Sequence, residues 1–404
     1  MIAKMIVALL LSLLPLRSCV SDGCAWLEAG IAALDAEVLP FPPADPRWRF
    51  RDAAVLAGDS VIAVLEDPAL PNTNRRKLQS NADPIGEASL KFQVGGEGLV
   101  MVDADRWWYA TAGQTDDGVY GAQLFEGGSQ GEVSSRFVPL PFDGPSLWVT
   151  LPGAVPAGLH LSFRADEFQA LEVDSRGVRR SWRGLPAPMH VALSARRRAA
   201  ARLPDGRIAM ISLERGGQGW RRVLLHVLGD EGRISERVLA DRHEFSGVAM
   251  AAHPDGKVAV AVSLRFSNDE TAGIQATIID VDDFAEPSWR TLSKSQRVTA
   301  PKVVSTSRGF IAAWSEAGGS EPMRLRAVEL DPKRSRAAIV DIGVVAGSDL
   351  WSVHASSGEP VFLWLDGDPQ KLMVRRPAMP LDEFAAVEAL VEWCTGRTSA
   401  VPVP

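Results

Sequence analysis

The hydrophobic positions of this chain recur with a long period. A glycine followed at once by an apolar strand pattern occurs at intervals of 50, 53 and 49 residues in the second half of the sequence, and once more 48 residues earlier. These glycines are Gly158, Gly206, Gly256, Gly309 and Gly358. Self-similarity at a period of this length predicts a repeat architecture, and each unit is expected to consist of strands.

Each repeat resolves into four strand patterns separated by turns. In the unit around Gly256 they are residues 247–253, 257–264, 274–281 and 289–293, and the turn Pro254-Asp255-Gly256 joins the first two. Proline presets one dihedral angle of such a turn and glycine tolerates a positive φ, so these two strands are predicted to form a hairpin. The second strands are unbroken apolar runs, which indicates burial on both faces.

Seven such units fit between residues 47 and 380. The seventh has only three strand patterns, at residues 350–356, 360–366 and 371–377. Four-stranded antiparallel units packed around an axis form a β-propeller, whose ring must close. Residues 47–51, with the sequence RWRFR, are therefore predicted to supply the missing strand of the last blade. A tandem of β-sandwiches is the structural alternative, and it would not require the two ends of the chain to meet.

In this architecture the chain resembles seven-bladed β-propellers of exported bacterial proteins, over residues 47 to about 380. The expected fold is all-β, with seven four-stranded antiparallel blades, and helices are expected to flank it at the N- and C-terminal ends. It is a resemblance of architecture and points to no functional family. The Gly-His and Trp-Asp dipeptides typical of WD40 blades are absent, and residues 305–314 only loosely resemble the box of sialidase-type propellers.

Both ends of the chain show helical spacing of apolar residues. One stripe, within residues 22–46 and ahead of a proline-rich spacer, is Cys24, Leu27, Ile31, Leu34 and Val38; the other, within residues 381–404, is Phe384, Val387, Val391 and Cys394. Cys24 begins the first predicted helix and Cys394 ends the second, so an antiparallel helix pair would bring their sulfur atoms together. A Cys24–Cys394 disulfide is predicted, and two buried free thiols are the alternative.

Residues 1–21 have the pattern of an export signal. Lys4 precedes an apolar run, residues 5–14, that is too short to span a bilayer. Leu16-Arg17-Ser18-Cys19 resembles a bacterial lipobox, which implies lipidation of Cys19; cleavage near Ser18 or Ser21 is the alternative. Either reading predicts an exported protein, in the periplasm, on the outer membrane or at the cell surface, that contacts a membrane only through a lipid anchor.

Composition and motifs limit which partners, metals and cofactors the chain is expected to bind. The chain has 404 residues, 46% of them hydrophobic, and a net charge of −7, which argues against a nucleic-acid partner. The sequence contains no Cys-x-x-Cys or His-Glu-x-x-His spacing, and its acidic turns lack the spacing of a calcium loop, so no metal or cofactor is predicted. His160 and His354 fall on inner-strand patterns and are candidates to approach the central channel.

Two further motifs have competing interpretations. Gly127-Gly128-Ser129-Gln130-Gly131 matches the nucleophile elbow of α/β-hydrolases, but the strand patterns on both sides of Ser129 favour a hairpin. Trp107 and Trp108 are adjacent in a strand pattern and face opposite ways. At least one is expected to pack between blades, and the other is a candidate for stacking on a saccharide.

The second strands of the repeats end in polar residues. In a propeller the loops that follow them share one face, around the channel mouth, where such scaffolds place ligand contacts. The candidate ligand contacts are Arg164, Asp166, Glu214, Arg265, Glu316 and Asp366. The sequence therefore predicts a binding or scaffolding module for a protein or a saccharide, without an evident catalytic set. A saccharide hydrolase or lyase with its site at the channel mouth is the alternative.

Overall fold

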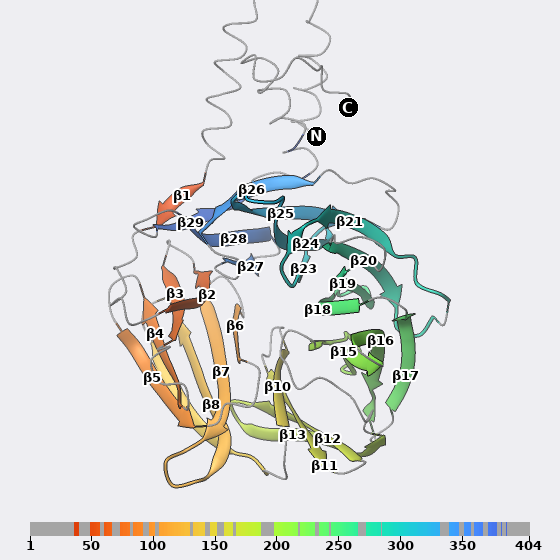
Figure 1. Cartoon of the computed structure of the whole chain (residues 1–404). Coiled ribbons are helices and arrows are strands. Elements are labelled where there is room, and N and C mark those ends of the chain that lie inside the picture. The colour runs from red at the N-terminus through yellow and green to blue at the C-terminus, as the bar shows by residue number, and fades with distance from the viewer. Residues whose placement is uncertain are drawn as a thin grey trace, which may run out of the picture.

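The chain forms a ring of seven blades around one axis (Figure 1). The computed structural model describes residues 36–39, 49–56, 60–66, 73–80, 84–91, 97–101, 105–129, 132–141, 146–151, 157–164, 167–186, 198–216, 219–230, 234–241, 244–265, 272–283, 285–331, 339–346, 351–356, 359–366, 371–377, 381 and 385. Within them, every blade has four antiparallel strands. The all-β, seven-bladed propeller predicted from the repeat is confirmed.

In the first three blades the strands run outward from the channel in chain order. Blade 1 contains β2 (Arg49–Val55), β3 (Val61–Glu66), β4 (Thr73–Ser80) and β5 (Pro84–Lys91); blade 2 contains β6 (Glu97–Met101), β7 (Arg106–Gln114), β8 (Tyr120–Gly128) and β9 (Val133–Pro139); blade 3 contains β10 (Ser146–Leu151), β11 (Ala157–Arg164), β12 (Glu167–Asp174) and β13 (Gly177–Pro186). A single pair, Lys91 with Gln114, also links blade 1 to blade 2.

Blades 4 to 6 follow the same plan. Blade 4 contains β14 (Arg198–Arg202), β15 (Ile208–Gly216), β16 (Gly219–Leu228) and β17 (Ile234–Asp241); blade 5 contains β18 (Glu244–Ala252), β19 (Lys257–Arg265), β20 (Ala272–Asp280) and β21 (Arg290–Ser295); blade 6 contains β23 (Lys302–Thr306), β24 (Gly309–Ala317), β25 (Met323–Leu330) and β26 (Val340–Val345). The two-residue strand β22 (Arg297–Val298) pairs with the end of β24, beyond β23.

Blade 7 is completed by the N-terminal part of the chain. It contains β27 (Trp351–Ser356), β28 (Glu359–Asp366) and β29 (Lys371–Arg375), and its outermost strand is β1 (Glu37–Leu39), which pairs antiparallel with β29. The innermost strands of all seven blades contact their neighbours in a closed ring that includes β2 against β27. The predicted closure of the ring by both ends of the chain is therefore confirmed.

The identity of the closing strand was predicted wrongly. Within the predicted donor, residues 47–51, Arg49 begins β2, the innermost strand of blade 1. The donor is β1, where Leu39 is buried among Leu363, Leu372 and other residues of blades 7 and 1, whereas Val38 is 56% exposed. Val38 therefore belongs to a strand and not to a helical stripe, because neighbours in a strand face opposite ways.

Hydrophobic clusters fill the seams between neighbouring blades. Seven clusters of buried residues are found in the described part of the chain, one at each seam, including the seam between blades 7 and 1. Along β3, Ala63 and Leu65 face blade 7 while Ile62 and Val64 face blade 2. Both faces of a blade are covered, so the second strands have no polar alternation.

Both tryptophans of the adjacent pair are used in this packing. Trp107 lies in the cluster between blades 1 and 2 and Trp108 in the cluster between blades 2 and 3, and each is at most 1% exposed. Neither ring is therefore available to stack on a saccharide, which corrects that reading of the pair.

The glycine period has more than one physical cause. Gly206, Gly256 and Gly309 have positive φ values of 88°, 89° and 136°, as expected for the turns that open the second strands. Gly158 is different: the turn before it lies outside the described residues, and a Cβ atom there would overlap the buried ring of Trp148. Gly158 therefore allows close packing of an aromatic ring against the backbone.

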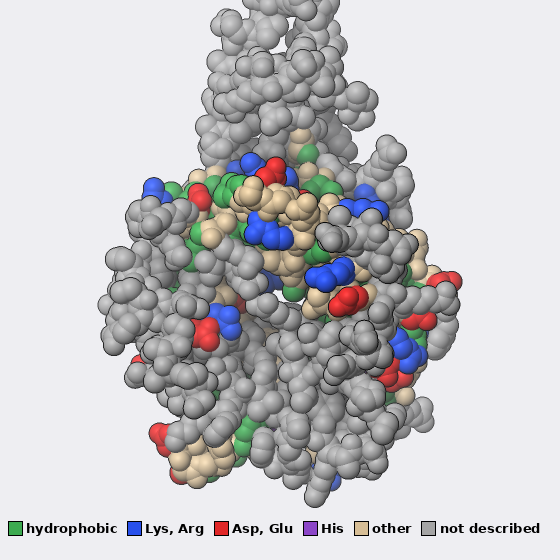
Figure 2. All heavy atoms as spheres, in the orientation of Figure 1, with side chains coloured by type: hydrophobic (Ala, Val, Ile, Leu, Met, Phe, Trp, Pro, Cys, Tyr) green, Lys and Arg blue, Asp and Glu red, His purple; other side chains and the backbone are tan. Residues whose placement is uncertain are grey.

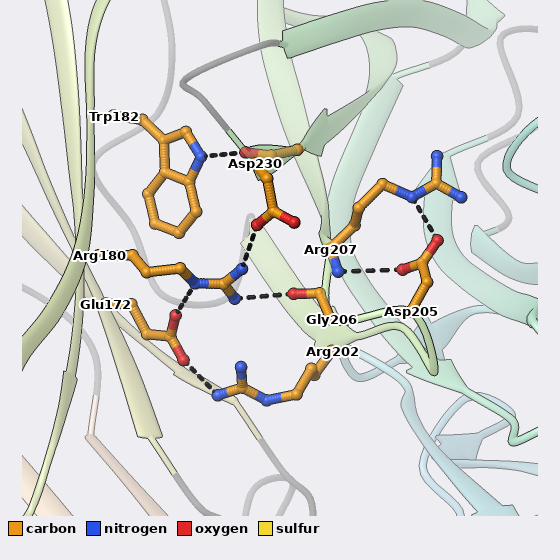
Figure 3. A network of polar contacts seen from close by, with 9 residues as sticks. Glu172, Arg180, Trp182, Arg202, Asp205, Gly206, Arg207 and Asp230 are labelled. Carbon is orange, nitrogen blue, oxygen red and sulfur yellow. Dashed lines mark hydrogen bonds and ion pairs between the residues drawn. The ribbon is translucent and has the colours of Figure 1, made fainter.

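Polar contacts between blades join positions about one repeat apart in the sequence. The indole of Trp182 donates to the carbonyl oxygen of Gly229, 47 residues further on, and Arg308 pairs with Glu359, 51 residues further on. At the seam between blades 3 and 4 these contacts form a network (Figure 3). Contacts across a seam therefore join residues that are separated by about one repeat period in the sequence.

Glu172 occupies the centre of that network. Its side chain is 1% exposed and accepts hydrogen bonds from Arg180 of its own blade and from Arg202 of blade 4 (Figure 3). Arg180 also donates to the carbonyl oxygen of Gly206 at 2.7 Å and pairs with Asp230 at 3.1 Å. Burial raises the pKa of Glu172, but the bonds from the two arginines lower it by more and keep the carboxylate ionised.

Candidate functional site

The mouth face carries the ends of the second strands. Because the strands of a blade are antiparallel, the loops after the second strands lie at the same end as the segments that lead into the first strands. Figure 2 shows basic and acidic side chains of described residues close to one another on the viewed side. The candidate ligand contacts therefore have to be considered one by one.

Most of the candidates that the structure describes either form an ion pair or hydrogen bond or do not line a groove. Glu214 forms an ion pair of 2.7 Å with Arg222, and Glu316 accepts a hydrogen bond of 2.8 Å from the indole of Trp314 and lies 3.4 Å from Arg326. Arg265 is exposed at the end of β19. For Arg164 only the backbone, at the end of β11, is described, and Asp166 lies outside the described residues.

Asp366 is the candidate that lies in a hollow. A groove of about 770 Å³ runs between the ends of blades 6 and 7 on the mouth face. Its described lining is Arg297, Val298, Thr299, Glu321, Pro322, Met323, Val344, Val345, Ala346 and Asp366. Four segments thus build its walls: the entry into blade 6, the loop between β24 and β25 with the start of β25, the end of β26, and the end of β28. A volume of this size is typical of ligand sites, which span about 300–1,000 Å³.

Hydrogen bonds to main-chain carbonyl oxygens, and one contact between two hydroxyl groups, hold the groove in shape. Arg297 donates from its guanidinium to the carbonyl oxygen of Glu321 at 2.9 Å, and the amide of Ala346 donates to the carbonyl oxygen of Leu365 at 2.8 Å. The hydroxyl of Thr299 lies 3.1 Å from that of Ser315 in β24. Loops fastened to rigid sheets in this way keep their side chains in place for a ligand.

Sequence reasoning missed all the lining residues except Asp366. It considered only the ends of the second strands, and three of the lining residues, Arg297, Val298 and Thr299, precede a first strand instead. The signal that could have found them is topological: in an antiparallel blade the segment before the first strand ends on the same face as the loop after the second.

A second group of polar side chains lies on the innermost strands of blades 1, 6 and 7. Lys302 on β23 donates to the carbonyl oxygen of Trp351 and lies 3.2 Å from the hydroxyl of Ser352, both on β27. Its ammonium is 3.7 Å from Asp52 on β2 and 5.2 Å from the centre of the Trp351 ring. Lys302 therefore connects three blades.

His354 adds a contact across the closing seam. Its Nε2 lies 2.6 Å from the carbonyl oxygen of Ala53, 2.8 Å from the hydroxyl of Ser352 and 3.8 Å from Asp52. Burial raises the pKa of Asp52, but the charge of Lys302 and the bond from His354 outweigh it and hold that pKa well below its usual range. The cluster is a charge-compensated joint between the last blade and the first.

Neither serine–histidine pair of the described residues combines the contacts of a hydrolase triad with an accessible serine. In a triad the two nitrogens of the histidine contact serine and carboxylate separately; in His354 the same nitrogen faces both Ser352 and Asp52. His226 does use both, with Nε2 3.1 Å from Ser212 and Nδ1 3.5 Å from Glu236. However, Ser212 is 1% exposed in the middle of β15, so a substrate carbonyl has no path to its hydroxyl.

The nucleophile-elbow motif forms a hairpin, as the sequence analysis favoured. β8 and β9 pair antiparallel on either side of it, and Ser129 follows β8 directly. The hydroxyl of Ser129 lies 3.3 Å from Asp105, and its amide donates to the carbonyl oxygen of the same residue at 2.7 Å. A strand–turn–helix, which holds the nucleophile in α/β-hydrolases, is not formed here.

His160 is fully buried in the second strand of blade 3 and does not reach the channel. It packs against Tyr120 of blade 2, with ring centres 5.5 Å apart, and neither ring nitrogen has a hydrogen-bond partner among the described residues. Burial lowers the pKa of His160 to about 4, from an ordinary value of 6.5. The ring is therefore neutral at pH 7, and its protonation opposes folding.

This burial predicts a loss of stability in mild acid. Between pH 6.5 and pH 4 the unfolded chain binds a proton at His160 and the folded chain does not, so the free energy of unfolding is expected to fall by about 3 kcal/mol across that interval. In denaturant titrations of a His160→Leu variant, the free energy of unfolding should fall by about 3 kcal/mol less over the same pH interval. An equal pH dependence of the variant and the unsubstituted protein would contradict the assignment.

Two structural absences concern only the described part of the chain. No three histidine, cysteine, aspartate or glutamate side chains converge there as metal ligands would. None of the helical residues described belongs to a segment with the length and apolar character needed to cross a bilayer. The cysteines proposed for lipidation and for the disulfide, Cys19, Cys24 and Cys394, lie outside the described residues.

Comparison with known proteins gives similarity of structure only. No family model matches the chain, and no curated protein matches its sequence. Similar solved structures include a protein of unknown function from Dyadobacter fermentans (11% identity, TM-score 0.41, covering 73% of this chain and 96% of that one). Another is the Penicillium chrysogenum alpha-L-arabinanase complexed with arabinobiose (12% identity, TM-score 0.42, 86% and 98%). A third is a prolyl endopeptidase (13% identity, TM-score 0.43). The similarity covers 88% of this chain and 52% of that one, so this chain spans about half the length of the endopeptidase.

Proposed function

We propose that the protein is an exported binding or scaffolding module that recognises its ligand with the mouth face, at the groove between blades 6 and 7. The observation that carries the proposal is the groove itself, whose walls come from the connecting segments of two blades. Ligand contacts of a rigid scaffold are commonly placed on such segments. The joint around Lys302 has a structural role and is not part of the proposed site.

The lining of the groove favours a protein ligand over a saccharide. Six of its ten described lining residues are apolar, and none of the ten is aromatic. The other four supply one guanidinium, two carboxylates and one hydroxyl. Apolar surface beside a few charged groups is typical of contacts with a polypeptide, in which a hydrophobic centre is surrounded by polar groups.

The proposal includes the exported location and the Cys24–Cys394 disulfide. Ala36, just before β1, and Ala385, at the other end of the chain, pack against the same hydrophobic cluster between blades 6 and 7. The described residues nearest to the two cysteines in the sequence thus lie at one seam, which supports a bridge between them.

Site-specific photo-crosslinking tests the proposed face. A photo-crosslinking residue in place of Pro322, at the groove, is expected to form an adduct with the ligand in an envelope extract of the source organism. The same residue in place of Arg176, in the turn between β12 and β13 on the opposite face, should form none. Asp366→Arg should abolish the adduct at position 322 because it reverses a charge in the groove. Adducts at position 176 alone, or an adduct at 322 that survives Asp366→Arg, would contradict the proposal.

The alternative of a saccharide hydrolase or lyase needs two carboxylates at a suitable separation, about 5–10 Å. Among the described channel-side residues of the joint there is a single carboxylate, Asp52, and it is bound by Lys302 and His354. The groove does contain two carboxylates, Glu321 and Asp366, but none of its described lining residues is aromatic, so a saccharide ring would have no stacking partner there. For this reason we favour binding.

A further inference from the structure

We infer that the groove between blades 6 and 7 receives a short peptide segment that carries an aliphatic side chain next to a lysine or arginine. This inference rests on the proposed function and names the chemistry of the ligand. It follows from three properties of the lining: the floor is apolar, the charge of the open groups is negative, and the one arginine already has a partner.

The floor of the groove is aliphatic. Met323 and Val345 are largely buried members of the hydrophobic cluster between blades 6 and 7, at 9% and 3% exposure. Val298 is half-buried against the cluster between blades 5 and 6, and Val344 is half-buried as well. All four residues belong to the lining of the groove, so its lining between the charged groups is aliphatic. Burying an aliphatic side chain against such a surface removes apolar area from water, which favours binding.

The open charges of the groove are acidic. Asp366 and Glu321 form no hydrogen bond or ion pair through their carboxylates with the described part of the chain, although Lys371 lies opposite Asp366 in the register of β28 and β29. Arg297, by contrast, is bound to the carbonyl oxygen of Glu321. The lining thus holds two carboxylates and one guanidinium, a net negative charge that favours a cationic group.

The sheet geometry places acid and apolar surface next to each other. Glu321 precedes the floor residue Met323 by two positions, and Asp366 reaches the groove from the neighbouring blade. A peptide that places a leucine or valine on the floor therefore has its neighbouring side chains near one or both carboxylates. A basic residue there would form ion pairs with the carboxylates, whereas an acidic residue would be repelled by them.

Two synthetic peptides test this chemistry directly. The probes are fluorescein-labelled, C-terminally amidated pentapeptides with the sequences Gly-Lys-Leu-Lys-Gly and Gly-Glu-Leu-Glu-Gly, and fluorescence anisotropy with the full chain measures their binding. The basic peptide is expected to bind at least about tenfold more tightly than the acidic one, a difference of about 1.4 kcal/mol. Its affinity should fall as salt is added, because the charges at the rim are solvated.

Matched variants separate the groove from general charge attraction. Asp366→Asn combined with Glu321→Gln should weaken the basic peptide at least about tenfold. Asp230→Asn combined with Glu359→Gln removes the same two charges from the opposite face, where their side chains are 76% and 47% exposed, and should leave the affinity unchanged. Thermal unfolding of both double variants checks that the fold is intact.

Three results would overturn the inference: equal affinity for both peptides, an unchanged affinity in the groove variant, or no binding of either peptide up to about 1 mM. If the crosslink at position 322 still depended on Asp366 in that case, the proposed function would stand and only the ligand chemistry would be wrong. If the crosslink failed as well, both would fall.

Discussion

Replacing Glu172 with glutamine is expected to lower the free energy of unfolding by about 4 kcal/mol, because it leaves Arg180 and Arg202 without their shared buried carboxylate. The two arginines come from different blades, so the loss weakens the seam between blades 3 and 4 (Figure 3). Urea denaturation at pH 7, with the midpoint and the slope both analysed, measures the effect.

The control for this change is Glu214→Gln. Glu214 also pairs with an arginine, Arg222, but the side chains are 18% and 46% exposed and both belong to blade 4. Exposed pairs of this kind contribute at most about 1 kcal/mol. A loss for Glu172→Gln no larger than that for Glu214→Gln would show that the buried network does not stabilise the seam.

The same residue predicts a pH dependence. Because the pKa of Glu172 is lowered in the folded protein, its stabilisation is fully present above the unfolded pKa, about 4.3, and is lost as the pH falls through the folded value. Glu172→Gln should therefore be destabilised most, relative to the unsubstituted protein, near neutral pH, and the difference should shrink in acid.

Replacing Gly158 with alanine is expected to lower the free energy of unfolding by about 3 kcal/mol or more, since overpacking against a fixed ring forces the backbone or the ring to move. The new Cβ atom would overlap the six-membered ring of Trp148, which is fully buried between blades 2 and 3. Thermal and chemical denaturation measure the loss.

Two comparisons identify the cause. Gly206→Ala places a Cβ atom where nothing lies within 4 Å, at a φ of +88°, so it should cost only about 1 kcal/mol through backbone strain. In the Trp148→Leu background the added cost of Gly158→Ala should be much smaller, because the clashing ring is gone. Equal costs in both backgrounds would show that the ring is not the reason.

The repeat allowed most of the fold to be predicted from the sequence. The apolar runs of β19 and β24 predicted strands buried on both faces, and the structure buries Val260 and Ala312 completely between neighbouring blades. The closing strand was missed for a local reason. Val38 continued a helical spacing, whereas residues 49–55 form one strand whose first part was assigned to another blade.

The candidate site was harder to predict. Of the six ligand contacts predicted from strand ends, Asp366 lies in the groove, whereas Glu214 and Glu316 are engaged with partners in their own surroundings. Whether a polar residue is open or engaged depends on the side chains that approach it from other strands. The periodicity of the sequence does not show which side chains from other strands approach a given polar residue.

The sequence by itself determined the features that depend on neighbouring residues: the four-strand unit, its sevenfold recurrence, the positive φ of Gly206 and Gly256, and the need for the ring to close. Only the tertiary structure decided which N-terminal segment closes blade 7, which glycine makes room for Trp148, and which loops enclose the groove. The physical reason is distance along the chain. These features depend on contacts between segments separated in sequence, such as the one between Ala53 and His354, and their geometry is set by how whole blades pack against one another.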